Sequence, residues 1–121
     1  MSLHILADFY KCDRNALLKQ DSGLLILEHA IRESGLGKIC TKTHQFEPFG
    51  YTAFALLAES HIAVHTWPES EMALIDIFAC GAPEKAEKAY QTLVTFFSPE
   101  KICRKEIKRG LNSEDNTETS F

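Results

Sequence analysis

Two short apolar segments, 61–66 and 72–79, are separated only by the proline-containing segment 67–71, and this arrangement constrains the fold more than any other feature. Both segments have the length and the composition of strands. A spacer this short can hold only a turn, so the two strands must pair antiparallel as a hairpin. The hairpin predicts an antiparallel sheet at the centre of the fold.

Two segments outside the hairpin have helical character. Apolar residues at helical spacing predict a helix over 22–34, with Ser22 as its N-cap, and a second helix from Pro83 to about Phe97. The remaining apolar segments have strand character and complete the sheet; these are 3–9, 38–46, 52–58 and 101–108.

Two helices are too few to cover both faces of a sheet of this size. The sequence therefore predicts an α+β fold, a two-layer sandwich in which a mainly antiparallel sheet carries both helices on one face. The uncovered face then needs a partner, which favours a homodimer. We predict a single domain over residues 1–109, and we expect the polar segment 110–121 to be a disordered tail.

The composition is that of an ordinary globular domain and excludes several other classes of protein. Hydrophobic residues make up 45% of the chain and charged residues 25%, with a net charge of −4, which does not favour binding to nucleic acid. The basic residues of 101–109 alternate with apolar ones, so most of their charge is expected on a solvated strand face. No apolar segment approaches the roughly 20 residues of a membrane span, and no signal peptide is evident. We expect a cytoplasmic protein.

The cysteines are Cys12, Cys40, Cys80 and Cys103, and they are widely separated with no C-x-x-C spacing. A zinc site needs closely spaced ligand pairs, so we predict no metal site. Without an export signal, the four thiols are expected to be free.

The hairpin has an unusual density of reactive side chains, although each of them alone is typical of a turn or a strand. If the turn is centred on residue 69, the numbers of opposed residues sum to about 138, so Cys80 lies near the peptide bond between Glu59 and Ser60. His65 is roughly 16 Å from Ser60 along a regular strand, on the opposite face. Either the chain bends after Ser60, or His65 acts through a different contact.

The sequence from Glu59 to Glu69 is ESHIAVHTWPE, and Asp76 and Cys80-Gly81 follow it. This pattern resembles the signature of the bacterial and archaeal S-adenosylmethionine decarboxylase proenzymes, a pyruvoyl-dependent family. The segments 7–13 and 43–50 and the length of the chain are also similar to that family. The resemblance covers about residues 3–109.

The resemblance implies that the chain cleaves itself between Glu59 and Ser60, into a β chain of residues 1–59 and an α chain of residues 60–121. The Ser60 hydroxyl would attack the Glu59 carbonyl, and elimination and hydrolysis would convert Ser60 to a pyruvoyl group. This covalent cofactor would form a Schiff base with the substrate and accept the electrons released with CO2.

The resemblance also implies roles for five other residues. His65 matches the histidine that assists processing, and Cys80 matches the acid that reprotonates the substrate carbon. Glu69 matches the carboxylate that binds the ribose hydroxyls, while Phe46 and Trp67 match aromatic residues near the purine. The implied reaction converts S-adenosylmethionine to its decarboxylated form and CO2 for spermidine synthesis, at sites that lie in a dimer interface.

One departure from the family pattern leaves the substrate open. The family commonly has an aromatic–glycine–aromatic stretch after the matched Glu69, whereas this chain has Ser70-Glu71-Met72. The added carboxylate either is solvated and without effect or favours a substrate with a second cationic group, such as ornithine or arginine. Two hypotheses from other classes are an uncleaved, inactive regulatory homologue and a hydrolase that uses Cys80 and His65. The hydrolase lacks an assignable oxyanion site and a third orienting residue.

Overall fold

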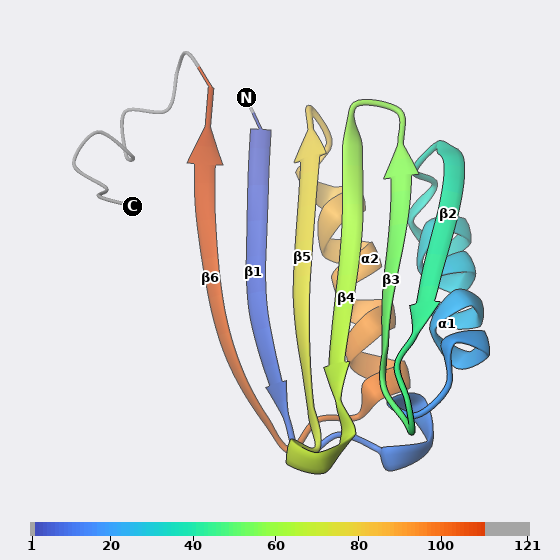
Figure 1. Cartoon of the computed structure of the whole chain (residues 1–121). Helices are drawn as coiled ribbons and strands as arrows, with labels where there is room; N and C mark the ends of the chain where they lie inside the picture. The colour runs from blue at the N-terminus through green and yellow to red at the C-terminus, as the bar shows by residue number, and fades with distance from the viewer. Residues whose placement is uncertain (1, 111–121) are drawn as a thin grey trace.

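The computed structural model describes residues 2–110 as one sheet with two helices on one of its faces (Figure 1). All strand pairs are antiparallel, and the strand order is β2-β3-β4-β5-β1-β6, so the predicted α+β sandwich is confirmed. Apart from Gly110, the tail predicted over 110–121 lies outside the described residues. The elements in chain order are β1 (Ser2–Tyr10), η1 (Arg14–Ala16), α1 (Gln20–Ser34), β2 (Lys38–Gln45), β3 (Tyr51–Leu57), β4 (Ser60–Trp67), η2 (Pro68–Ser70), β5 (Met72–Cys80), α2 (Pro83–Phe97) and β6 (Lys101–Arg109).

The start of α1 shows how tertiary structure replaces a local signal. The helix begins at Gln20, before the Ser22 predicted as its N-cap, and no side chain caps it from the preceding residue. Instead, the backbone N–H of Gln20 donates to Oε1 of Gln45 on β2, at 2.8 Å. A helix terminus needs such acceptors for its unpaired N–H groups, and here a neighbouring strand supplies one.

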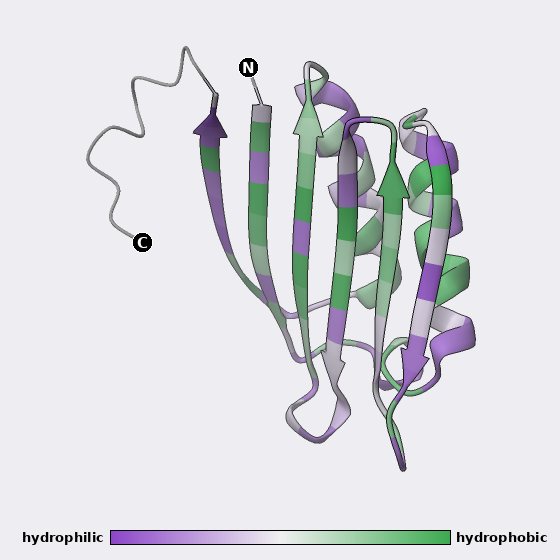
Figure 2. Ribbon diagram, turned by 45° about the horizontal axis from the view of Figure 1, so that its top comes forward, coloured by the Kyte–Doolittle hydropathy of each residue, from purple (hydrophilic) through white to green (hydrophobic). Residues whose placement is uncertain are grey.

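The central strands alternate between a face covered by the helices and the opposite face, which we call the open face. Ile5, Ile62 and Ile77 are fully buried on the covered face, where they belong to the same core as the helical residues Leu27 and Leu93. Figure 2 shows that hydrophobic residues predominate on β5, whereas the edge strand β6 is mostly hydrophilic. The alternation in burial along the central strands is what a sheet with one covered face requires.

Arg104 on β6 is an exception to the solvated strand face predicted for the C-terminal basic residues. Its guanidinium donates to Oε2 and Oε1 of Glu87 on α2, at 3.0 Å and 2.7 Å, and lies 4.3 Å from the ring centroid of Tyr90. These hydrogen bonds raise the pKa of Arg104 and lower the pKa of Glu87. The contacts attach the edge strand to the helix layer.

Gly23 of α1 lies against the ring of Tyr51, the first residue of β3. The Tyr51 side chain is fully buried, and its hydroxyl donates to the carbonyl oxygen of Ala16 at 2.7 Å. A Cβ added at Gly23 would lie 2.2 Å from Cε1 of Tyr51. The ring cannot retreat without breaking its hydrogen bond, so a side chain at this position strains the core.

We therefore predict that Gly23→Ala destabilises the protein by about 1–3 kcal/mol, although alanine is the better helix former. Urea unfolding of the variant and the wild type measures the difference. Ser22→Ala, one position earlier in the same helix, is the matched control and should change the free energy of unfolding by less than about 0.5 kcal/mol. A Gly23→Ala protein as stable as the wild type would contradict the packing described.

Candidate active site

Strand β4 carries the two residues that the sequence analysis found hardest to bring together, Ser60 and His65. The strand pairs continuously with β3 and with β5, and no register shift interrupts either ladder. It therefore does not bend after Ser60, and the separation of roughly 16 Å expected for a regular strand remains. Ser60 is 8% exposed and faces the helices, whereas His65 is on the open face. Within one chain, the structure does not bring these two residues together.

Ser60 begins β4 directly after a tight turn. Leu57 pairs with Ser60, so only Ala58 and Glu59 connect β3 to β4. Glu59 has a φ of 62°, a left-handed conformation that costs a non-glycine residue roughly 1–2 kcal/mol. The Ser60 hydroxyl donates to the carbonyl oxygen of Ala58 at 3.2 Å. The peptide bond predicted to be cleaved thus joins a strained residue to the first residue of a paired strand.

Cys80 ends β5 at the same end of the sheet. Ala79 pairs with Ser60, so opposed residues sum to 139 instead of about 138. Cys80 is therefore one residue beyond the predicted cleavage site, with its side chain on the open face and that of Ser60 on the covered face. The difference in the sum arises in the connection between β4 and β5. It consists of η2 and Glu71, which has a φ of 54°, and its midpoint lies between residues 69 and 70. The Cys80 thiol is half-buried and accepts a hydrogen bond from the Ser2 hydroxyl, with a distance of 3.2 Å between Oγ and Sγ.

The other end of β4 opens into a cleft of about 510 Å³. Four residues that the sequence analysis assigned to the site line this cleft together, namely His65, Phe46, Trp67 and Glu69. Thr52 and Arg14 also line it and were not predicted. Thr52 on β3 is opposite His65, and its Oγ1 is 3.0 Å from Nδ1 of the histidine. The sequence could have identified Thr52 only through the correct register between β3 and β4.

The loop that connects β2 to β3 forms one wall of the cleft and is held firmly. The Gln45 side-chain amide donates to the carbonyl oxygens of Leu18 and Gly50, at 3.0 Å and 2.9 Å. Gly50 has a φ of 107°, and a Cβ there would lie 3.1 Å from Cδ of Pro68, so this position needs glycine. The loop and η2 therefore pack closely enough to fix the aromatic walls.

The cleft combines aromatic surface with charge. The side chains of Phe46 and Trp67 remain 46% and 38% exposed, which leaves ring area free for a planar ligand. Glu47 and Glu69 add carboxylates, and Arg14 adds one guanidinium. The cleft can therefore hold an aromatic group that carries hydroxyls and a positive charge. Glu71 is exposed and is not among the described residues that line the cleft.

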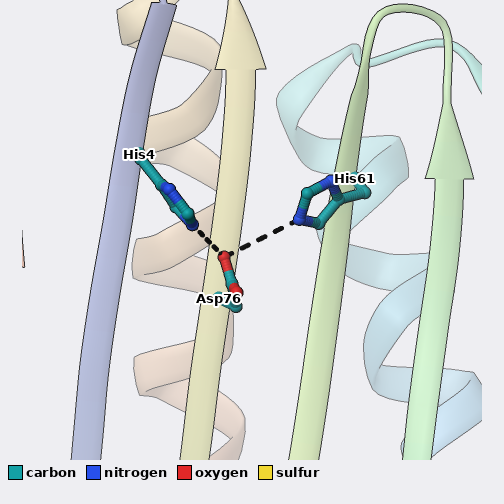
Figure 3. A group of neighbouring side chains, drawn as sticks. All are labelled: His4, His61 and Asp76. Atoms are coloured by element: carbon teal, nitrogen blue, oxygen red, sulfur yellow. Dashed lines mark hydrogen bonds and ion pairs between the residues drawn. The ribbon is translucent and has the colours of Figure 1, made fainter. Parts of the chain in front are cut away.

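A third group of polar side chains lies on the open face between the two ends (Figure 3). His4 hydrogen-bonds through Nε2 to Oδ1 of Asp76, and Nε2 of His61 is 3.7 Å from the same oxygen. The three residues come from β1, β5 and β4, and their ligand atoms lie within 4.8 Å of one another. Sequence spacing could not reveal this group, because it depends on the pairing of both His4 and His61 with Phe78.

Comparisons with known proteins agree with this geometry. A family model described as S-adenosylmethionine decarboxylase matches residues 3–110. The S-adenosylmethionine decarboxylase proenzyme of Aquifex aeolicus is 38% identical over 119 residues, which cover 98% of this chain and 88% of that protein. The corresponding proenzyme of Methanococcus aeolicus is 42% identical over 107 residues, which cover 88% of this chain and 92% of that protein. The crystal structure of the adenosylmethionine decarboxylase from Aquifex aeolicus superposes with a TM-score of 0.89 at 38% identity, over 94% of each chain.

We predict that a purine nucleoside such as methylthioadenosine changes the fluorescence of Trp67, the only tryptophan in the chain. Glu69→Gln should weaken this binding about 10-fold to 100-fold, because a charge-assisted hydrogen bond to the ribose is lost. Fluorescence titration measures both effects. Glu71→Gln is the matched control and should bind like the wild type. An emission spectrum that does not respond to the nucleoside would contradict the assignment of the cleft.

Proposed function

The chain belongs to the S-adenosylmethionine decarboxylase family, and we propose that its cofactor forms at Ser60 and that its active site combines the two ends of β4 in a homodimer. As a member of this family, it is a pyruvoyl-dependent lyase that decarboxylates S-adenosylmethionine for polyamine synthesis. The observation that carries the assignment of Ser60 is the strained Ala58-Glu59 turn immediately before it.

The turn suits a self-cleavage reaction because breaking the Glu59–Ser60 bond releases the left-handed conformation of Glu59. The Ser60 hydroxyl attacks the carbonyl carbon of Glu59, the C–N bond breaks, and an ester replaces the amide. Removal of the proton from Cα of Ser60 then expels the Glu59 carboxylate. The resulting dehydroalanine takes up water and releases ammonia, which leaves a pyruvoyl group. The net reaction consumes one water molecule and needs no oxidant or reductant.

The residues at this end of the sheet fit the cofactor and its reaction. When formed, a pyruvoyl group supplies the electron sink that amino-acid side chains lack. Cys80 is close to the cleavage site in the strand register, and its half-buried thiol can deliver a proton to the substrate carbon. Its hydrogen bond from Ser2 limits the positions that the sulfur can adopt. These contacts support the role of Cys80 as the proton donor.

The substrate contacts lie at the other end of β4, which supports a dimeric site. The open face exposes Phe54 and Leu56 in addition to Trp67, so it has apolar area for a second copy to cover. If two copies stack open face to open face about a two-fold axis, with their β4 strands antiparallel, the cleft end of each lies beside the cleavage end of the other. His65 of one copy then lies at the cleavage end of β4 in the other, which accounts for their separation within a chain. Processing also requires the Ser60 side chain to turn from the helix-covered face toward the open face.

In this arrangement each cleft positions the substrate for the opposite copy. Phe46 and Trp67 hold the purine, and Glu69 accepts hydrogen bonds from the ribose hydroxyls. The carboxylates of the cleft also favour the sulfonium charge. Because Glu71 does not line the cleft, it gives no support to ornithine or arginine as the substrate.

We also assign the reaction to the cytoplasm. The four cysteines are all free thiols, including the exposed Cys40 and Cys103, as is usual in a reducing compartment. No helix of the described residues is long and apolar enough to cross a membrane.

We predict that purified wild-type protein consists of two fragments, 1–59 and 60–121, and that Ser60→Ala remains a single full-length chain. Intact-mass spectrometry measures the fragments, and the α chain should be blocked to Edman degradation because it lacks an N-terminal amine. Ser70→Ala, in the exposed loop of the same hairpin, is the matched control and should cleave like the wild type. Wild-type protein that stays uncleaved after prolonged incubation would contradict the proposed function.

The same preparations test the substrate. Carboxyl-labelled S-adenosylmethionine, ornithine and arginine are offered separately to the processed enzyme, and released CO2 is counted. Label release from S-adenosylmethionine alone is expected, with none from Ser60→Ala. Release from ornithine or arginine alone would contradict the assignment of the cleft to a purine nucleoside.

A further inference from the structure

We propose that His61 is a positioning residue that anchors the cofactor after cleavage, an inference that rests on the proposed formation of the pyruvoyl group at Ser60. His61 is the residue to which that group stays attached by a peptide bond. It has no place in the processing chemistry described above. On the open face, its side chain contacts Phe54 on β3, Phe78 on β5 and Asp76.

Cleavage creates the need for such an anchor. Before cleavage, Ser60 is held by the turn on one side and by the strand on the other. Afterwards it becomes the first residue of a chain, and chain ends fray unless they are tied down. The conversion also releases the nitrogen of Ser60 as ammonia, so β4 loses the backbone N–H of its first residue. The next residue must then fix the position of the reactive carbonyl.

Two aromatic rings hold the imidazole of His61. The Phe54 ring on β3 stacks on it with a centroid distance of 5.7 Å and an interplanar angle of 23°. The Phe78 ring on β5 stacks at 5.7 Å and 29°. Because these strands lie on the two sides of β4, the rings restrict the histidine from both directions. Stacking at such distances is favourable beyond the area that it buries.

Asp76 is held in turn by a chain of two donors, of which Figure 3 shows the second, His4. Arg109 has no acceptor, so its Nη1, 3.4 Å from Nδ1 of His4, donates to that nitrogen. His4 then carries its proton on Nε2 and donates it to Asp76. A metal ion on Nε2 of a neutral His4 requires the proton on Nδ1, where the guanidinium would oppose it. The arrangement therefore favours a support over a metal site: Asp76 is held by the hydrogen bond from His4 and contacts His61 at 3.7 Å.

The test compares His61→Ala with His61→Phe, which keeps a ring between Phe54 and Phe78. Intact mass first establishes the cleaved fraction, so that kcat is expressed per cleaved chain. His61→Ala should lower kcat at least about tenfold while KM changes less than about threefold, because a small displacement of the reacting group is costly. Phenylhydrazine should also modify its cofactor carbonyl several-fold faster, as followed by mass. His61→Phe should restore both quantities to within about threefold of the wild type.

Phe54→Ala gives the same test with the Glu59-Ser60-His61 sequence intact, which matters if His61→Ala blocks cleavage. Because Phe54 also lies on the face that a second copy covers, size-exclusion chromatography first establishes that the variant remains dimeric; it should then shift kcat and the phenylhydrazine rate in the same directions as His61→Ala. Phe96→Ala is its matched control, because Phe96 is 38% exposed against 37% for Phe54 and contacts His29 at 5.1 Å in the helix layer. This control should behave like the wild type.

Wild-type kcat and an unchanged phenylhydrazine rate in cleaved His61→Ala and Phe54→Ala would overturn the anchor while leaving cleavage at Ser60 established. Zinc titrated into the wild-type protein provides a further test. Stoichiometric binding that Asp76→Asn abolishes would also overturn the proposal, because the group would then be a metal site. An uncleaved wild-type chain would instead contradict the proposed function itself.

Discussion

Backbone pairing of β4 with both of its neighbours is the constraint on which the rest of the site depends. The ladders to β3 and β5 keep the strand regular from Ser60 to Trp67, so its two ends cannot approach each other. Each end therefore has its own chemistry. The proposed cleavage site and Cys80 are at one end, and the aromatic and acidic cleft is at the other. In the proposed dimer, a second copy of the chain brings the two together.

The open face connects these two ends physically. No helix within residues 2–110 covers it, and it carries apolar side chains together with the polar group of His4, His61 and Asp76. The polar residues are close to the cleavage end and the cleft is beyond His65, so a dimer across this face covers both. In the proposed mechanism, the strained turn at Glu59 adds a local driving force for cleavage, and the stacked His61 then holds the new chain end. The proposed function thus couples folding, dimerisation and cofactor formation through β4.

Much of this could be predicted from the sequence because the signals were local. Alternating apolar residues determined the strands, and the loop after Trp67 determined the hairpin. The cleft residues were identified only through the family resemblance, since Phe46 is far from Glu69 in the sequence. Thr52 and the His4–Asp76 contact were missed, because they depend on the register between strands. The predicted cap at Ser22 failed because a glutamine on another element replaced it.

The most direct test of the shared site is complementation between two inactive variants. Cys80→Ala removes a residue of the cleavage end, and Glu69→Ala removes a residue of the cleft end. Each variant alone should be cleaved but, at substrate concentrations well below KM, should decarboxylate S-adenosylmethionine at only a small fraction of the wild-type rate. The two variants are co-expressed with different tags. Random pairing makes about half of the dimers mixed, and each mixed dimer has one intact site out of two, so about a quarter of wild-type activity should return. If the mixed dimers are isolated and remain inactive, each site lies within one chain and the account is contradicted.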